Sequence, residues 1–195
     1  MAPVARGREG LTARVEEWLQ VPAPVIGMSP EGTDDRPGLT GLETLLWTEG
    51  AGLWGPPPTT LGGTRVEVQA WPAEHRWDTG DGSPQPGTTP PSGHLYVVAC
   101  AGSEQEPPAS GSCEGTSAQP QAVHVYETKS SVGVPGTGAY TVRVTTIWHA
   151  RYRVLQPSGP GPWIPLPERQ TEASRPYRVQ EVRSALIPER KRLPR

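Results

Sequence analysis

The two cysteines, Cys100 and Cys113, are the residues whose type and spacing most directly suggest chemistry. They are separated by twelve residues in a stretch rich in Gly, Ser and Pro, which offers free thiols little apolar cover. We expect a disulfide, which would stabilise the fold by roughly 3 kcal/mol and would persist in an oxidising compartment. The alternative is a zinc site that also uses His94 and His124, but the chain has no C-x-x-C pair and no closely spaced histidines.

A second group of chemically active side chains lies in the segment W-D-T-G-D-G at residues 77–82. The carboxylates of Asp78 and Asp81 flank Gly80 and could supply oxygen ligands to calcium, although calcium loops of the EF-hand type use more acidic residues. The glycines permit the positive φ angles that a tight turn needs. The segment therefore predicts a structural turn, and we expect no metal and no other cofactor.

Tryptophan is the third residue type of interest. Four indoles, at Trp47, Trp54, Trp71 and Trp163, exceed what one core of this size readily buries. Tryptophans on an exposed face can stack on sugar rings or contact a protein partner, and we single out Trp71 and Trp163 for this role. The alternative is that these side chains pack beneath the long loops.

The chain carries no sequence signature of catalysis. It lacks G-x-S-x-G, H-E-x-x-H, the phosphate-binding G-x-x-x-x-G-K and a G-x-G-x-x-G that follows a strand. None of the four histidines stands in a recognisable catalytic pattern, so we interpret them as structural. The sequence therefore predicts a protein that is not an enzyme.

Composition narrows the class of protein further. The 195 residues include 25 Pro and 23 Gly, which indicates one folded domain with long connections. The net charge of −2 and the absence of a large basic block argue against nucleic acid as a partner. No segment approaches the ~18 apolar residues of a transmembrane helix. Residues 1–10 lack the apolar run of an export signal, which indicates a cytoplasmic protein or, as we expect, a further segment upstream.

The pattern of residues predicts a mostly β chain with one helix. Leu11, Val15, Trp18 and Leu19 repeat at helical spacing, so residues 1–21 form an N-terminal segment with a helix of at most three turns. Short strands are expected at residues 25–28, 42–47 and 75–78, and a regularly alternating strand at residues 65–71, which Pro72 ends or bends.

The longest regular element begins at Tyr140. Apolar residues occupy the even positions from 140 to 154 and polar residues most of the odd ones, which predicts a strand with one buried face. Its length favours a bend or bulge near His149, followed by a projecting hairpin at residues 158–162. The returning strand is expected at residues 171–186 and carries a second bulge. A basic flexible tail follows at residues 188–195.

Three motifs resemble the signatures of PKD (polycystic kidney disease) domains. W-D-T-G-D-G, H-V-Y at residues 124–126 and G-A-Y-T-V at residues 138–142 are similar to the family's W-D-F-G-D-G, H-x-Y and G-x-Y-x-V. The similarity covers residues 22–187 and implies an immunoglobulin-like β-sandwich, as in exported actinobacterial proteins with a single PKD-like domain. The long Pro- and Gly-rich loops follow from composition, and the enlarged loop at residues 84–121 departs from the family pattern. Thr79 departs from the family's usual aromatic or large apolar residue. The residues that carry the resemblance are Trp77, Asp78, Gly80, Asp81, Gly82, His124, Tyr126, Gly138 and Tyr140.

The resemblance also implies roles for residues and for the chain. Trp77 should fill the space between two sheets, and the hydroxyl of Tyr140 should bond to the backbone at a sheet corner. We expect a monomeric, non-catalytic module of the cell envelope or extracellular space that spaces, adheres or binds a protein or cell-wall glycan. One alternative is a carbohydrate-binding accessory domain of a secreted hydrolase system. Another is a small hydrolase with a site in residues 84–121, where no nucleophile and base stand at interpretable spacing.

Overall fold

The computed structural model describes residues 3–181, apart from residues 51, 83–94, 101, 104–105, 109–112 and 135. His94, the end of the expected returning strand at residues 182–186 and the basic tail at residues 188–195 lie outside the described residues. Across the part of the chain that is described, most regular structure is β. The elements are α1 (Pro3–Trp18), β1 (Val25–Ser29), β2 (Gly38–Leu39), β3 (Glu43–Glu49), β4 (Thr59–Leu61), β5 (Thr64–Asp78), β6 (Leu95–Ala99), β7 (Ala122–Val125), α2 (Ser130–Gly133), β8 (Tyr140–Gln156), β9 (Gly159–Pro160), β10 (Ile164–Tyr177) and β11 (Val179–Gln180).

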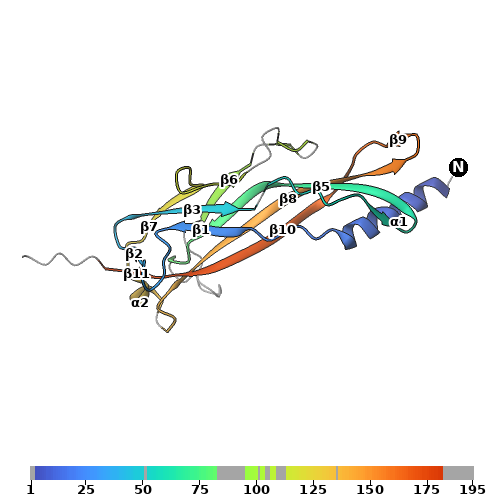
Figure 1. The fold of residues 1–195 in the computed structure, drawn as a ribbon. Helices are drawn as coiled ribbons and strands as arrows, with labels where there is room; N and C mark the ends of the chain where they lie inside the picture. The colour runs from blue at the N-terminus through green and yellow to red at the C-terminus, as the bar shows by residue number, and fades with distance from the viewer. Residues whose placement is uncertain are drawn as a thin grey trace, which may run out of the picture.

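Two antiparallel sheets form the body of the molecule. The larger sheet has the order β10-β8-β5-β4, with β6 also paired to β5 and β9 paired to β8. The smaller sheet has the order β1-β3-β7, and β2 and β11 form a short parallel pair. The three long strands β5, β8 and β10 run almost the whole length of an elongated molecule (Figure 1). The small sheet covers one half of their length and α1 covers the other half.

The same face of the large sheet supports both coverings, because the even-numbered residues of β8 are buried from Tyr140 to Tyr152. Its buried residues with even numbers include Tyr140, Val144, Trp148 and Tyr152, as the sequence predicts. Successive side chains of a strand point to opposite faces, so these residues share one face. That face contributes Tyr140 and Val144 to the core beneath the small sheet, and Trp148 and Tyr152 to the core beneath α1.

In β5 and β10, the two neighbours of β8, the pairing register shifts by one residue at the boundary between the two cores. The pairing of β5 with β8 shifts between Pro72 and Glu74, and that of β10 with β8 shifts between Leu166 and Arg169. Both shifts lie opposite Trp148, which confirms the bulge expected near this point but places it in the partner strands. An extra residue moves the following side chains to the other face. The bulges therefore keep both cores on one face of the sheet.

The sandwich core joins both sheets. It contains Trp77 from β5, which has no exposed surface, as the sequence predicts. The buried members of this core are Ile26, Met28, Leu46, Trp77, Ala122, Tyr126, Tyr140, Val142, Val144, Tyr177 and Val179. A two-layer β arrangement of this kind is the predicted fold class.

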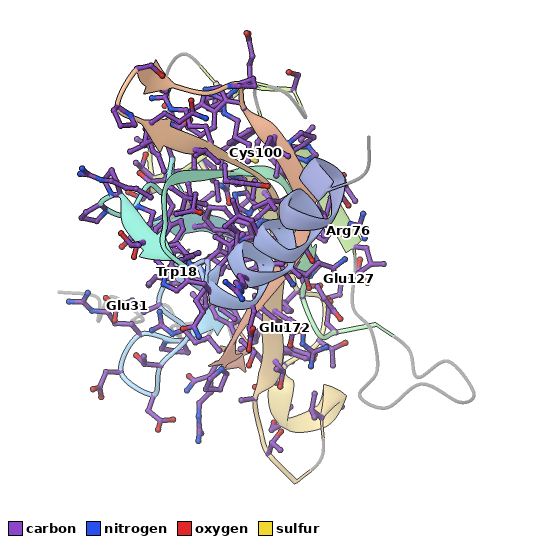
Figure 2. The ribbon with its side chains drawn as sticks, turned by 90° about the vertical axis from the view of Figure 1, so that its right-hand side faces the viewer. Trp18, Glu31, Arg76, Cys100, Glu127 and Glu172 are labelled. Carbon is purple, nitrogen blue, oxygen red and sulfur yellow. A yellow bond between two sulfur atoms is a disulfide. The ribbon has the colours of Figure 1, made fainter. Side chains whose placement is uncertain are left out.

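The N-terminal helix α1 is longer than expected and is part of the fold. It spans 16 residues, against the three turns predicted. Val15 is fully buried against the large sheet, in a core that also holds Val66, Val68 and Trp148. Figure 2 looks along the molecule from this end and shows α1 lying across the strands. The helix therefore shares a core with the large sheet.

Two strand predictions are corrected by the structure. The strands expected at residues 65–71 and 75–78 form one strand, β5, because the bulge beside Pro72 accommodates the proline without ending the pairing. The strand expected to begin at residue 171 begins at Ile164. The first residues of β10 include Pro165 and Pro167. Proline disfavours a central strand because it has no N–H to donate, but it is tolerated in β10, which lies at the edge of the sheet.

Candidate functional site

The acidic segment after β5 forms a tight turn. The backbone N–H of Gly80 donates to Oδ1 of Asp78 at 2.9 Å, and Gly80 has a φ of +74°. A Cβ at this position would lie 2.5 Å from the carbonyl oxygen of Thr141, so a side chain has no room. Glycine is therefore required here by both conformation and contact with β8. This agrees with the structural turn predicted from the sequence.

The second carboxylate of the segment, that of Asp81, is the centre of a hydrogen-bonded chain between the two sheets. Its Oδ2 lies 2.7 Å from Nε2 of His124 on β7, and its Oδ1 accepts a bond from the hydroxyl of Thr79 at 2.5 Å. The other ring nitrogen of His124, Nδ1, lies 2.9 Å from the hydroxyl of Tyr96 on β6. Burial raises the pKa of Asp81, but the bonds from His124 and Thr79 outweigh it and lower the pKa to about 2.

The chain Asp81–His124–Tyr96 has the connectivity of a catalytic triad with a phenol at its end. A nucleophilic hydroxyl needs a lowered pKa or a base that takes its proton. Burial and the nearby charge of Asp81 instead raise the pKa of Tyr96. His124 is almost fully buried, with 3% of its surface exposed, and stacks edge-on against Tyr126 at 4.4 Å between ring centroids. The arrangement therefore favours a structural link between β6 and β7.

The tyrosines of the other two motifs bond to backbone carbonyls. The hydroxyl of Tyr140 donates to the carbonyl of Thr128 at 2.8 Å, as expected for a sheet corner, and that of Tyr126 donates to the carbonyl of Thr79 at 3.1 Å. The ring of Tyr126 also stacks on that of Tyr140, with 5.0 Å between centroids. Thr79 is fully buried within this network, so a hydroxyl that bonds to Asp81 replaces the large side chain expected at its position.

The two candidate metal sites considered from the sequence differ from the group of ligand side chains that the described residues bring together. Asp78 and Asp81 do not belong to any group of at least three ligand side chains found among the described residues. His124 is bonded to Asp81 and Tyr96 and does not lie with the cysteines. His94, the other histidine of the zinc alternative, lies outside the described residues.

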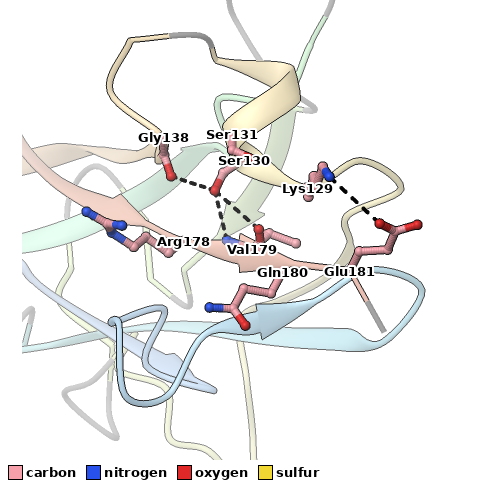
Figure 3. Close-up of a pocket in the computed structure, with 8 residues that line it drawn as sticks. All are labelled: Lys129, Ser130, Ser131, Gly138, Arg178, Val179, Gln180 and Glu181. Carbon is pink, nitrogen blue, oxygen red and sulfur yellow. Dashed lines mark hydrogen bonds and ion pairs between the residues drawn. The ribbon is translucent and has the colours of Figure 1, made fainter. Parts of the chain in front are cut away.

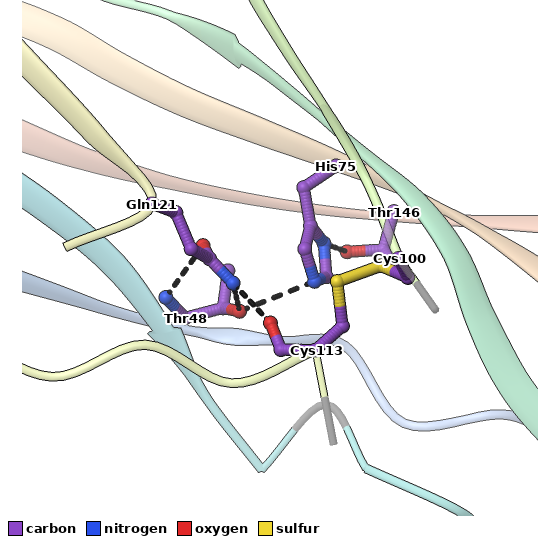
Figure 4. The surroundings of a disulfide bond; sticks show 6 residues. All are labelled: Thr48, His75, Cys100, Cys113, Gln121 and Thr146. Atoms are coloured by element: carbon purple, nitrogen blue, oxygen red, sulfur yellow. Dashed lines mark hydrogen bonds between the residues drawn. A yellow bond between two sulfur atoms is a disulfide. The ribbon is translucent and has the colours of Figure 1, made fainter. Parts of the chain in front are cut away.

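Cys100 and Cys113 form the disulfide that the sequence predicts, with 5.2 Å between their Cα atoms. Figure 4 shows the sulfur pair beside the imidazole of His75, between β3, β5 and β8. The hydroxyl of Thr146 lies 2.9 Å from Nδ1 of His75, and that of Thr48 lies 3.3 Å from Nε2. All three of these residues are fully buried.

The surroundings of the disulfide also affect the protonation of His75. Burial lowers its pKa from 6.5 to about 4, although a hydrogen bond to the backbone of Cys113 partly opposes this change. The side-chain amide of Gln121 donates both to the hydroxyl of Thr48 and to the carbonyl of Cys113. The disulfide therefore sits beside a polar network, and it is burial that keeps the imidazole of His75 neutral at neutral pH.

The two tryptophans singled out as ligand-binding residues differ in exposure. Trp71 is fully buried on the outer side of the large sheet, and its Nε1 donates to the carbonyl of Ser103 at 3.2 Å. Trp163 is partly exposed. The guanidinium groups of Arg151 and Arg153 each lie 4.4 Å from its ring centroid. Of the pair, Trp163 is therefore the one that can meet a ligand.

The two arginines beside Trp163 are held by acceptors on the neighbouring strand β5. Arg151 donates to the amide oxygen of Gln69 at 3.0 Å, and Arg153 pairs with Glu67 at 2.7 Å. Arg151 also lies 5.3 Å from the centroid of Trp71, so indoles and guanidinium groups alternate across this face. We call Trp163, Arg151, Arg153, Glu67 and Gln69 the Trp163 surface.

A pocket of about 320 Å³ lies at the opposite end of the molecule, beside α2 (Figure 3). Its charged groups are already engaged, since Lys129 lies 3.8 Å from Glu181. The hydroxyl of Ser130 donates to the carbonyl of Gly138 at 2.7 Å, which ties α2 to the start of β8. The pocket is lined by Lys129, Ser130, Ser131, Gly138, Arg178, Val179, Gln180 and Glu181.

Sequence reasoning did not identify His75, Tyr96 or the arginines of the Trp163 surface as part of any site. For the two arginines, the one available signal was the alternation of Arg151 and Arg153 on the polar side of the strand.

Among the described residues, none of the helices has the length and apolar character that a membrane crossing needs. Comparison of the chain with protein-family models, with curated proteins and with solved structures finds no match, and the resemblance to PKD domains is therefore carried by the sequence motifs.

Proposed function

We propose that this chain is a non-catalytic, immunoglobulin-like β-sandwich module of the PKD type that binds a protein or glycan partner outside the cytoplasm. The three sequence motifs support the family, and the two packed sheets are compatible with it. The disulfide supports an oxidising compartment, such as the cell envelope or the extracellular space.

One observation carries the non-catalytic part of the proposal. Four side chains of the motifs that could perform chemistry form hydrogen bonds within the fold. Asp81 is bonded to His124, and the hydroxyls of Tyr126 and Tyr140 donate to backbone carbonyls. None of these four side chains lines the pocket beside α2. Groups used in this way stabilise a fold and are not presented to a substrate.

The binding part is supported by the Trp163 surface. Tryptophan, tyrosine and arginine are enriched in the residues that dominate protein interfaces. Arg151 and Arg153 lie on β8, and Trp163 directly precedes β10, at the end of the elongated molecule where β9 pairs with β8 (Figure 1).

Binding of the oxidised protein to isolated cell-wall glycans and to envelope proteins tests the proposal. We expect saturable binding that falls by about tenfold or more when Trp163 is changed to Ala, as for a central interface residue. Leu95→Ala is the matched control, because Leu95 is 69% exposed and lies on β6, at the other edge of the sheets. Equal binding of the two variants, or no saturable binding by the wild type, would contradict the proposal.

A carbohydrate-binding role is the second candidate, favoured by the partial exposure of Trp163. Sugar rings stack on an indole face, and here Arg151 and Arg153 already lie over the ring, so a glycan would have to displace one guanidinium or bind at the ring edge. Glycan-array binding lost in Trp163→Ala and strengthened in Arg153→Ala would support this role. Binding that survives Trp163→Ala would count against it.

A further inference from the structure

We propose that, when its disulfide is reduced, the protein binds a zinc ion through His75, Cys100 and Cys113. One ligand atom from each of the three residues lies within 4.8 Å of the others. This is the only group of three or more such side chains found among the described residues. The histidine comes from within β5, far from both cysteines in sequence, and differs from the two histidines considered from spacing alone.

The distances require little rearrangement of the backbone. Zinc–sulfur bonds are about 2.3 Å long, so two thiolates at a tetrahedral zinc stand about 3.8 Å apart. The sulfurs must therefore separate from bonding distance by less than about 2 Å, which rotation about the Cα–Cβ bonds supplies while the Cα atoms stay near 5.2 Å. Both cysteines are partly exposed, which gives a reductant and a metal ion a route to the sulfurs.

His75 is already oriented as a ligand. In the tautomer that donates Nδ1–H to the hydroxyl of Thr146, Nε2 carries the lone pair, and a metal bound there would replace the present contacts of the ring with Thr48 and with the backbone of Cys113. Zinc-binding histidines usually have a bond of this kind, because it fixes the ring. Figure 4 shows the Nε2 side of the ring turned toward the sulfur pair.

Charge and ligand type favour zinc. Two thiolates and a neutral imidazole bring two negative charges, which a divalent ion neutralises in a site whose histidine is fully buried. Thiolate and imidazole are the ligands that zinc prefers, and a Cys₂His set leaves a fourth position. The hydroxyl of Thr48 lies on the Nε2 side of His75, where it or a water molecule would complete the tetrahedron.

A dithiol is the reductant that opens the Cys100–Cys113 disulfide before zinc binds. The dithiol transfers two electrons and two protons to the disulfide, so that it becomes a cyclic disulfide while Cys100 and Cys113 become thiols. Zinc then replaces the two thiol protons, which are released to the solvent. In the reverse exchange, the cyclic disulfide takes two electrons from the thiolates and two protons from the solvent, so that the dithiol and the Cys100–Cys113 disulfide form again and the ion is released. The site is thus complete in the reduced protein and closed in the oxidised one.

Cobalt substitution tests the site in the full-length chain. We expect the protein, reduced with a dithiol and freed of reductant without air, to bind one Co²⁺ with a thiolate-to-cobalt charge-transfer band and tetrahedral visible bands. Zinc should displace the cobalt and abolish the bands. The oxidised protein should show neither the charge-transfer band nor the tetrahedral visible bands when cobalt is added. Thr146→Val, which removes the bond to Nδ1 but no ligand, should weaken zinc binding by about 10- to 100-fold.

Ligand variants complete the test. Cys113→Ser and His75→Gln should each weaken zinc binding of the reduced protein by more than about 100-fold, beyond the effect of Thr146→Val. Absence of the charge-transfer band in reduced, folded wild-type protein would overturn the proposal. If reduction unfolds the chain, zinc should restore the folded circular dichroism spectrum together with the band, and failure to restore both would overturn it equally.

Discussion

Acid stability provides the sharpest test of the packing around the disulfide. His75 is fully buried between the hydroxyls of Thr48 and Thr146, and burial lowers its pKa from 6.5 to about 4 against a weaker opposing bond to the backbone of Cys113. A neutral imidazole is therefore required by the folded state. The unfolded chain has no such requirement, because its imidazole is solvated.

The sign and size of the effect follow from this difference. Between pH 6.5 and about pH 4 the unfolded chain takes up a proton at His75 that the folded protein does not bind. The contribution to stability is therefore complete above pH 6.5 and is lost as the pH falls through this window. At about 1.4 kcal/mol for each pH unit, the expected loss is about 3 kcal/mol.

Urea unfolding of the oxidised protein, followed by tryptophan fluorescence from pH 7 to pH 4, measures this loss. His75→Gln should be less stable than the wild type at pH 7 but should have a shallower pH dependence, because the titrating group is gone. Val66→Ala, a change in the fully buried core under α1, controls for lower stability and should keep the wild-type pH dependence. The same pH dependence in His75→Gln as in the wild type would refute the reasoning.

Three further predictions concern the turn, its hydrogen bonds and the helix. Asp81→Asn should remove the stability that the wild type loses between pH 3.8 and about pH 2, about 2 kcal/mol, so equal acid-unfolding curves would contradict it. Gly80→Ala should cost about 3 kcal/mol in chemical denaturation, because a Cβ would meet the backbone of Thr141, whereas Gly41→Ala, at a φ of +76° in open space, should cost about 1 kcal/mol. Equal costs would show that the contact is unimportant. Val15→Ala should lower the free energy of unfolding by about 2 kcal/mol, and an unchanged urea midpoint would disprove the packing of α1.

Local patterns predicted the parts of the fold that depend on neighbouring residues. The alternation after Tyr140 predicted the strand and its buried face, because side chains of a strand alternate regardless of what covers them. The glycines at residues 80 and 82 predicted the turn, and the composition around Cys100 predicted the disulfide. The burial of Trp77 and the backbone bond of Tyr140 were implied by the resemblance and are present.

Contacts between distant segments could not be predicted in this way. The pairing of Tyr96 with His124 depends on the edges of two sheets meeting, and the position of His75 beside the disulfide depends on the bulge that turns it inward. The burial of Trp71 agrees with the alternative that the indoles pack beneath long loops, because the segment at Ser103 covers this side chain on the outer face. The ligand-binding role expected for Trp71 is therefore not supported. Sequence alternation describes which face a residue occupies, and it does not reveal what lies over that face.

The redox state of the two cysteines in the native protein is the most direct test of the central claim, that this is a module of an oxidising compartment. Protein isolated from its own source would be alkylated without reduction, digested and analysed by mass spectrometry. The peptides that contain Cys100 and Cys113 should be found joined, two hydrogens lighter than their sum and without alkyl groups. Alkyl groups on both cysteines would contradict the claim and place the protein in a reducing compartment.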